Sequence, residues 1–140
     1  MLKIVIAHFV VVSVLVFAHD DDTFNDIREH CNETFQIPHD YDNQLVHLGS
    51  FPDESDKTPM CFVHCVMDKS AMMDAEGTFD SKVMVEKLQG FPNGTEYEDL
   101  QEMIDNCITE NAQEDLCERS YGFAKCLMTE EIKRHGESAK

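Results

Sequence analysis

Along most of the chain after residue 22, apolar residues recur every three or four positions, the spacing that places them on one face of an α-helix. The first such stretch begins at Thr23, a typical N-cap residue, and its apolar face consists of Phe24, Ile27, Cys31 and Phe35. No stretch alternates in the manner of a half-buried β-strand. The pattern therefore predicts an all-α fold.

Two further helices are predicted in the middle of the chain. A short one covers residues 41–48 and ends at Gly49, a residue that readily adopts the left-handed conformation of a helix end. The next begins with Thr58 as its N-cap and Pro59 in its first position. Because this second helix is apolar on most sides, we expect it to be buried.

Three more helices are predicted in the second half, and each is bounded by capping or turn-forming residues. Gly77 ends the preceding region, and Asp80 or Ser81 begins the first of the three helices. The 90–94 turn separates it from the second, which begins with the capping box of Thr95 and Glu98. A polar break at Asn111 precedes the third, which contains Leu116. The polar segment 129–140 is expected to be a disordered terminus or to rest its basic residues on an acidic surface.

Residues 1–18 have the composition of a secretory signal peptide: Lys3, an apolar run over 4–17, and a small residue, Ala18, at the end. The apolar run is shorter than the roughly 20 residues that a membrane-spanning helix needs. We therefore expect this leader to be removed and residues 19–140 to form one secreted, extracellular domain without membrane insertion.

The charge of the chain excludes one class of partner. The formal net charge is −17, and without Lys3 there remain 10 basic and 28 acidic side chains, a charge of −18. Such a surface repels phosphate backbones and anionic lipids, so nucleic acid is not an expected partner. High solubility in an extracellular fluid is sufficient to account for the charge.

Six cysteines, separated by 29, 3, 41, 9 and 8 residues, indicate a disulfide framework in a secreted domain. Cys61 and Cys65 share one helix face, but Cβ atoms four residues apart lie about 5–6 Å from each other. A disulfide needs roughly 3.5–4.5 Å, so these two should not bond each other. Of the 15 pairings that six cysteines allow, twelve remain open.

The short gaps in Cys61-Phe-Val-His-Cys65 and between Cys117 and Cys126, in an acidic helical chain with a leader, resemble those of the insect pheromone and general odorant-binding proteins. The resemblance covers the whole of residues 19–140. It implies about six helices around an internal apolar cavity. It also implies three disulfides, which on this chain are Cys31–Cys65, Cys61–Cys117 and Cys107–Cys126.

That family implies an extracellular carrier of small apolar or amphipathic molecules, such as odorants, pheromones or similar semiochemicals, without catalysis and without a cofactor. A membrane receptor is an expected partner for such a carrier, and the expected oligomeric state is a monomer or a weak homodimer. The alternative is a secreted interaction protein of reproductive or salivary fluid whose core is filled.

Methionine supports the carrier interpretation, because its flexible thioether suits a wall that accommodates varied apolar ligands. The residues concerned are Met60, Met67, Met72, Met73, Met84, Met103 and Met128. The predicted ligand-binding residues all lie on apolar helix faces. They are Phe62, Val66, Met84, Val85, Leu88, Leu100, Met103, Ile104, Tyr121 and Phe123. The Tyr121 hydroxyl is the predicted hydrogen-bonding group for a ligand oxygen.

Metal sites and catalytic centres are poorly supported. The 74–80 run imitates part of a calcium loop, but with Gly77 in sixth place the anchoring positions fall on Met72 and Val83, which cannot bind the ion. The zinc-like trio Cys61, His64 and Cys65 lacks a second pair of ligands. No nucleophile elbow and no secreted-phospholipase pattern is present. The chain is therefore predicted to be neither a metalloprotein nor an enzyme.

Two sequons for N-glycosylation occur, at Asn93 in a predicted surface turn and at Asn32 beside a cysteine. Asn93 is the more accessible of the two by this interpretation.

Overall fold

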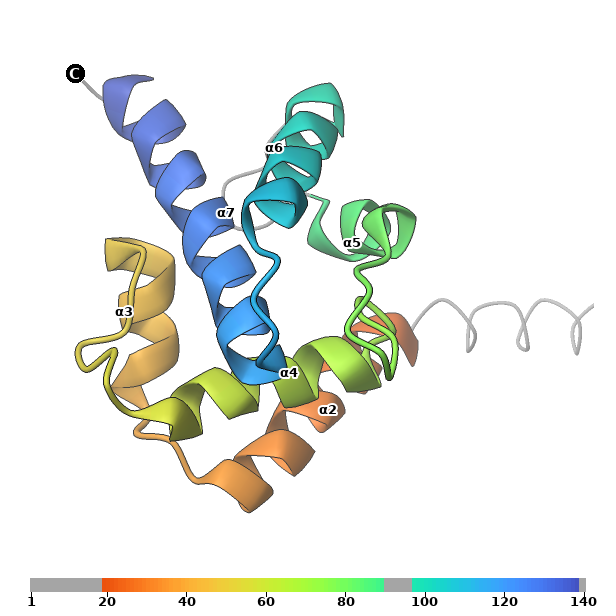
Figure 1. Ribbon diagram of the computed structural model, residues 1–140, viewed down its shortest axis with the longest axis vertical. Helices are drawn as coiled ribbons and strands as arrows, with labels where there is room; N and C mark the ends of the chain where they lie inside the picture. Colours follow the sequence, from red (N-terminus) through yellow and green to blue (C-terminus); the bar gives the residue numbers. More distant parts are fainter. Residues whose placement is uncertain (1–18, 90–96, 139–140) are drawn as a thin grey trace, which may run out of the picture.

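The computed structural model of the protein describes residues 19–89 and 97–138, which form six α-helices (Figure 1). They are α2 (His19–Phe35), α3 (Asp40–Leu48), α4 (Lys57–Lys69), α5 (Ser81–Leu88), α6 (Tyr97–Glu110) and α7 (Leu116–Ser138). Within these two ranges the β-type pairing is limited to an isolated bridge between Met73 and Phe79. The predicted all-α fold is confirmed.

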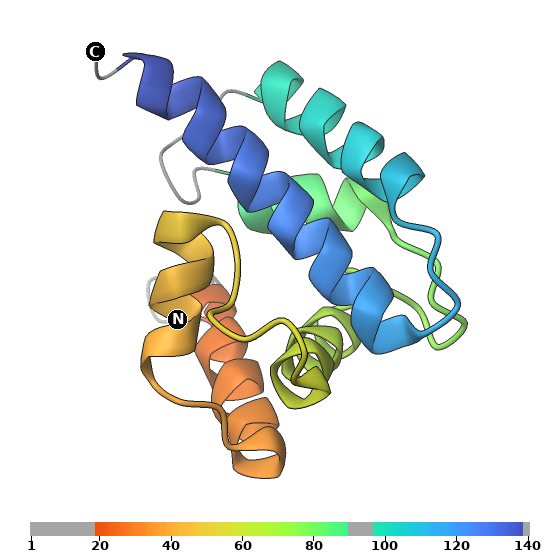
Figure 2. The ribbon, with the colours of Figure 1, turned by 60° about the vertical axis from the view of Figure 1, so that its left-hand side comes forward.

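Helices α4 and α7 form the centre of the molecule and make the most extensive contact between helices in the described ranges. In Figure 1, α4 crosses the lower part of the molecule with α2 packed against it, and α7 rises from α4. Figure 2 shows α3 on one side of α7 and α6 on the other, with α5 packed against α6. The apolar interior lies where these helices meet.

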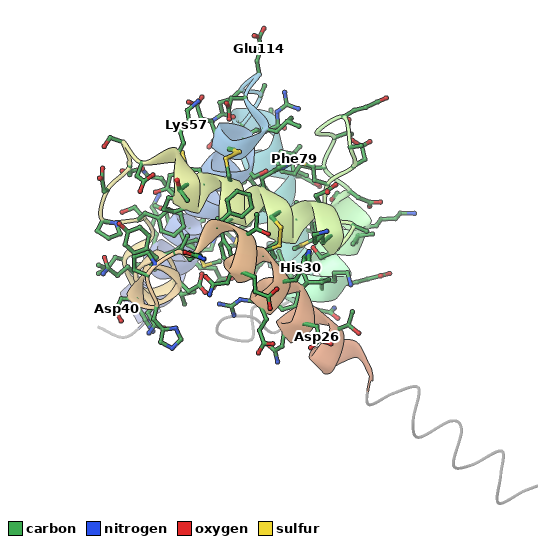
Figure 3. The ribbon with its side chains drawn as sticks, turned by 90° about the horizontal axis from the view of Figure 1, so that it is seen from below. Asp26, His30, Asp40, Lys57, Phe79 and Glu114 are labelled. Atoms are coloured by element: carbon green, nitrogen blue, oxygen red, sulfur yellow. A yellow bond between two sulfur atoms is a disulfide. The ribbon has the colours of Figure 1, made fainter. Side chains whose placement is uncertain are left out.

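Three disulfides join the helices, and they are the ones that the family resemblance implies. Cys31–Cys65 ties α2 to α4, Cys61–Cys117 ties α4 to α7, and Cys107–Cys126 ties α6 to α7. The sulfur–sulfur bonds are drawn in yellow in Figure 3, where α2 lies in front of α4. As helix geometry predicts, Cys61 and Cys65 do not bond each other, and each joins α4 to a different helix.

Two of the predicted helix starts are wrong. Helix α2 begins at His19, so Thr23 lies inside it. The N-cap of α4 is Asp56, whose side chain accepts a hydrogen bond from the Thr58 backbone N–H at 3.0 Å. Asp is as good an N-cap as Thr, and this choice leaves Pro59 in the first turn, where its missing N–H is not needed.

Three further predicted boundaries agree with the structure. Gly49 ends α3 with a φ of 82° and donates its N–H to Leu45 O at 3.0 Å. Asp80 caps α5 by accepting from the Val83 N–H at 3.2 Å. Asn111 marks the predicted break after α6, and its side chain donates to Cys107 O at 2.8 Å.

Residues 70–80, which connect α4 to α5, form a turn around Gly77. Gly77 does not end a helix, because α4 has already ended at Lys69. The Asp74 carboxylate accepts from the backbone N–H groups of Glu76 and Thr78, each at 2.9 Å. Gly77 has a φ of 85°, and a Cβ placed there would come within 2.3 Å of a Leu116 methyl group. The acidic run therefore shapes a turn that packs on α7.

The C-terminal segment differs from the expected disordered terminus, because α7 continues as a helix to Ser138. Glu131 is 1% exposed, and the Arg134 guanidinium lies 3.9 Å from Asp99 on α6 and 3.9 Å from Glu130 one turn earlier. The alternative prediction, a basic residue resting on an acidic surface, is confirmed for Arg134. The ion pair to α6 and the burial of Glu131 accompany helical order in a stretch whose composition alone is too polar to predict it.

Several predictions concern residues outside the described ranges. They are the leader 1–18, the turn 90–94, the Thr95 cap and the sequon at Asn93. The other sequon residue, Asn32, is exposed on α2. Among the described helices, none is both long and apolar enough to cross a membrane.

Candidate ligand-binding interior

The interior of the molecule is rich in methionine. Seven methionine side chains, from α4, the following turn, α5, α6 and α7, are each 8% exposed or less. They are Met60, Met67, Met72, Met73, Met84, Met103 and Met128. All belong to one apolar cluster, so residues far apart in the sequence form a single deformable interior.

Eight of the ten predicted ligand-binding residues lie in this cluster. Phe62, Met84, Val85, Leu100, Met103, Ile104, Tyr121 and Phe123 are 0–4% exposed. Val66 and Leu88 are partly buried and pack against the others. The structure therefore brings the ten side chains together between α4, α5, α6 and α7. Their contact with a ligand stays a prediction.

The Tyr121 hydroxyl is already hydrogen-bonded in this structure. It accepts from the Phe51 backbone N–H at 3.0 Å and lies 3.0 Å from Glu54 Oε2, to which it donates. The Phe51 ring stacks on the Tyr121 ring with 4.8 Å between centroids, and Tyr41 lies 5.4 Å beyond Phe51. The hydroxyl thus joins α7 to the segment between α3 and α4.

These surroundings change the acid–base behaviour of Tyr121. Burial raises the pKa of Tyr121 to about 12. The hydrogen bond that Tyr121 donates to Glu54 and the negative charge of Glu54 also raise this pKa, whereas the hydrogen bond from the Phe51 N–H lowers it. The hydrogen bond from Lys125 Nζ, at 2.6 Å, holds the pKa of Glu54 below its ordinary value.

We expect alkaline pH to destabilise the fold through Tyr121. The folded pKa is above the value near 10 of an unfolded tyrosine, so the unfolded chain loses this proton first. The stabilisation is complete below about pH 10 and is lost as the pH rises toward 12. Denaturant unfolding between pH 9 and 11 should show a steeper loss of stability for the natural protein than for Tyr121→Phe. Equal slopes would contradict the assignment.

Two open hollows lie on the surface. One, of about 580 Å³, runs along α7 and is lined by Glu54, Met60, Glu110, Asn111, Gln113, Glu118, Tyr121, Gly122, Lys125, Cys126, Thr129 and Glu130. The other, of about 540 Å³, lies beside the 70–80 turn and is lined by Asp68, Ala71, Met73, Asp74, Thr78, Phe79, Asp80, Ser81 and Lys82. Of the predicted ligand-binding residues, Tyr121 alone borders the first, and none borders the second. Both hollows are too charged to be the expected apolar cavity.

Sequence patterns did not indicate the residues around Tyr121. Phe51 lies between the helices predicted to end at Gly49 and to begin at Thr58, and it is 3% exposed, whereas Glu54 and Lys125 belong to no motif. The one available signal was Phe51 itself, a large apolar residue between Gly49 and Pro52 of a type that is often buried.

Disulfide bonds exclude the zinc-like trio Cys61, His64 and Cys65 as a metal site. Cys61 and Cys65 are both in disulfides, so neither offers the thiolate that zinc requires. His64 instead has its Nδ1 3.1 Å from the Ser120 hydroxyl, a fully buried group that also approaches Met73 Sδ at 3.5 Å. In the described part of the chain no three acidic, histidine or cysteine side chains are arranged to hold a metal ion.

Six helices, three interlocking disulfides and a methionine-rich interior define a disulfide-tied all-α domain. Its backbone resembles the solved odorant-binding protein dmelOBP28a of Drosophila melanogaster, with a TM-score of 0.64 over 82% of this chain and 93% of that chain, at 21% identity. Residues 17–130 match the PBP/GOBP family, so the chain belongs to this family of odorant-binding proteins.

Two relatives are similar in sequence. General odorant-binding protein 84a of Drosophila melanogaster is 27% identical over 108 residues, which are 76% of this chain and 57% of that protein. The chain thus spans little more than half the length of this relative. Odorant-binding protein 22 of Aedes aegypti is 25% identical over 130 residues, or 90% of this chain and 89% of that protein. Both relatives are named as odorant-binding proteins.

Proposed function

We propose that the protein is an extracellular carrier that reversibly encloses one small apolar or amphipathic molecule between α4, α5, α6 and α7. The observation that carries this proposal is the convergence of seven buried methionines on a single interior. A thioether side chain has three rotatable bonds and a polarisable sulfur, so it can move aside for a ligand and still contact it.

The same packing explains how a compact interior accepts a guest. Rigid cores of branched and aromatic residues resist a change of shape, because interiors are close-packed. In this protein the aromatic side chain Phe123 belongs to the same cluster as flexible ones such as Met84 and Met103. The ligand takes the place of mobile methionine side chains, which fill the space again when it leaves.

The carrier is secreted, with residues 1–18 as its leader, and the ligands are odorants, pheromones or similar semiochemicals. Family membership supports both parts of this proposal, and the acidic composition fits solubility in an extracellular fluid. Delivery to a membrane receptor and a monomeric or weakly dimeric state fit a soluble carrier that must release its cargo.

We expect the oxidised protein to take up a fluorescent apolar probe saturably, with one site per chain and a dissociation constant in the micromolar range, equivalent to about −8 kcal/mol. A long-chain alcohol should displace the probe, and the reduced, unfolded protein is the matched control. Fluorescence titration measures both. Absence of saturable, displaceable uptake would favour the alternative of a secreted interaction protein with a filled core.

A further inference from the structure

The hollow along α7 reaches the methionine-rich interior. Its volume is about 580 Å³, and two of its lining residues, Met60 and Tyr121, belong to the buried cluster. They are 8% and 4% exposed. The hollow therefore borders the core at these two side chains.

Glu54 lines the hollow from the segment 49–56, which connects α3 to α4 and lies outside both helices. Its central anchor is Phe51, which is 3% exposed and stacked on Tyr121. Removal of Phe51 from this position would uncover the Tyr121 ring. Phe51 thus covers one face of Tyr121, a residue that lines the hollow and belongs to the core.

A small set of polar contacts holds the segment against α7. Glu54 Oε2 accepts from the Tyr121 hydroxyl at 3.0 Å and from Lys125 Nζ at 2.6 Å, and the Phe51 N–H donates to Tyr121 at 3.0 Å. The Glu54 and Lys125 side chains are 44% and 43% exposed. Contacts between exposed charges are individually weak, so the Glu54 contacts can break without unfolding the helices.

We propose that the segment 49–56 is a gate over the ligand entrance of the carrier, and that Glu54 is the residue that holds it closed. The hollow along α7 is the entrance, and Phe51 is the plug between it and the interior. This inference rests on the proposed carrier function. A gate of this kind sets the rates of entry and exit, because the closed and open forms differ in access and not in the contacts made to the enclosed ligand.

The test is Glu54→Ala, with Glu110→Ala as the matched control. Glu110 lines the same hollow from α6 and removes the same charge when replaced, but it makes no bond to the segment in the described structure. In stopped-flow measurements with the fluorescent apolar probe, Glu54→Ala should raise both the association and the dissociation rate constants by roughly threefold or more, with the dissociation constant within about twofold. Glu110→Ala should leave both rate constants near those of the natural protein.

Unchanged rate constants in Glu54→Ala would overturn the gate. So would a change confined to the dissociation rate, since Glu54 would then act on the bound ligand. Hydrogen exchange at the Phe51 amide without any probe gives an independent measure, because this N–H is protected by Tyr121. Faster exchange in Glu54→Ala than in Glu110→Ala supports the gate, and equal exchange overturns it. Failure of the natural protein to take up any probe overturns the carrier function instead.

Discussion

Replacing Cys61 and Cys117 together with serine is expected to lower the free energy of unfolding by roughly 4 kcal/mol, the largest loss from any of the three disulfides. The reason is chain entropy: this bond closes a loop of 56 residues, whereas Cys31–Cys65 closes 34 and Cys107–Cys126 closes 19. It also joins the two helices with the most extensive contact, α4 and α7. The thermal midpoint should fall by about 15 °C.

Denaturant titration of the three paired serine variants gives the comparison. Loss of Cys107–Cys126 should lower the free energy of unfolding by roughly 3 kcal/mol, because this bond closes the shortest loop and so restricts the unfolded chain least. The order of the three losses is thus the informative result. If the Cys107–Cys126 variant proved less stable than the Cys61–Cys117 variant, native packing and not loop closure would control the contribution of these bonds.

The helical pattern and the cysteine order could be predicted from the sequence because both depend on local spacing. Residues at positions 31, 61 and 107 fall on apolar helix faces, and helix geometry alone excludes the Cys61–Cys65 bond. The choice among the twelve remaining pairings came from resemblance to a family. It requires knowledge of which helices are neighbours, and periodicity does not contain that information.

Helix ends were less predictable, because several residues near a boundary can serve as a cap. Asp56 and Thr58 are both good N-caps, and the structure uses Asp56. The end of α7 was missed for another reason. Arg134 and Glu131 have no apolar signal, and their order depends on packing between α7 and the rest of the molecule.

The sequence predicted which residues of the candidate site are buried. It did not predict how the segments around the site are arranged in space. Apolar periodicity correctly placed Leu100, Met103 and Ile104 in the interior, at 0–1% exposure. Apolar periodicity gave no information on the segment 49–56, because one buried residue such as Phe51 does not form a repeating pattern. The attachment of this segment to Tyr121 joins residues 70 apart in the sequence, which only the fold brings together.

A charge placed in the methionine-rich interior should abolish ligand uptake. Met103 is 1% exposed on α6, so the guanidinium of Met103→Arg would enter the proposed ligand space without a partner. We expect the affinity for the apolar probe to fall by roughly 100-fold or more, equivalent to about 2.7 kcal/mol. Two controls separate charge in the interior from other effects. Met103→Leu conserves volume, and Glu102→Arg introduces the same residue at the adjacent exposed position.

A buried arginine also weakens the fold, and a variant that unfolds would say nothing about the site. Leu88→Arg provides the second measurement, since Leu88 is partly exposed at the end of α5 and an arginine there can extend its charged end into water. This variant should stay helical by circular dichroism and lose probe affinity by about tenfold, or 1.4 kcal/mol. If both folded arginine variants bound the probe as well as the natural protein does, the ligand would lie outside the space between α4, α5, α6 and α7.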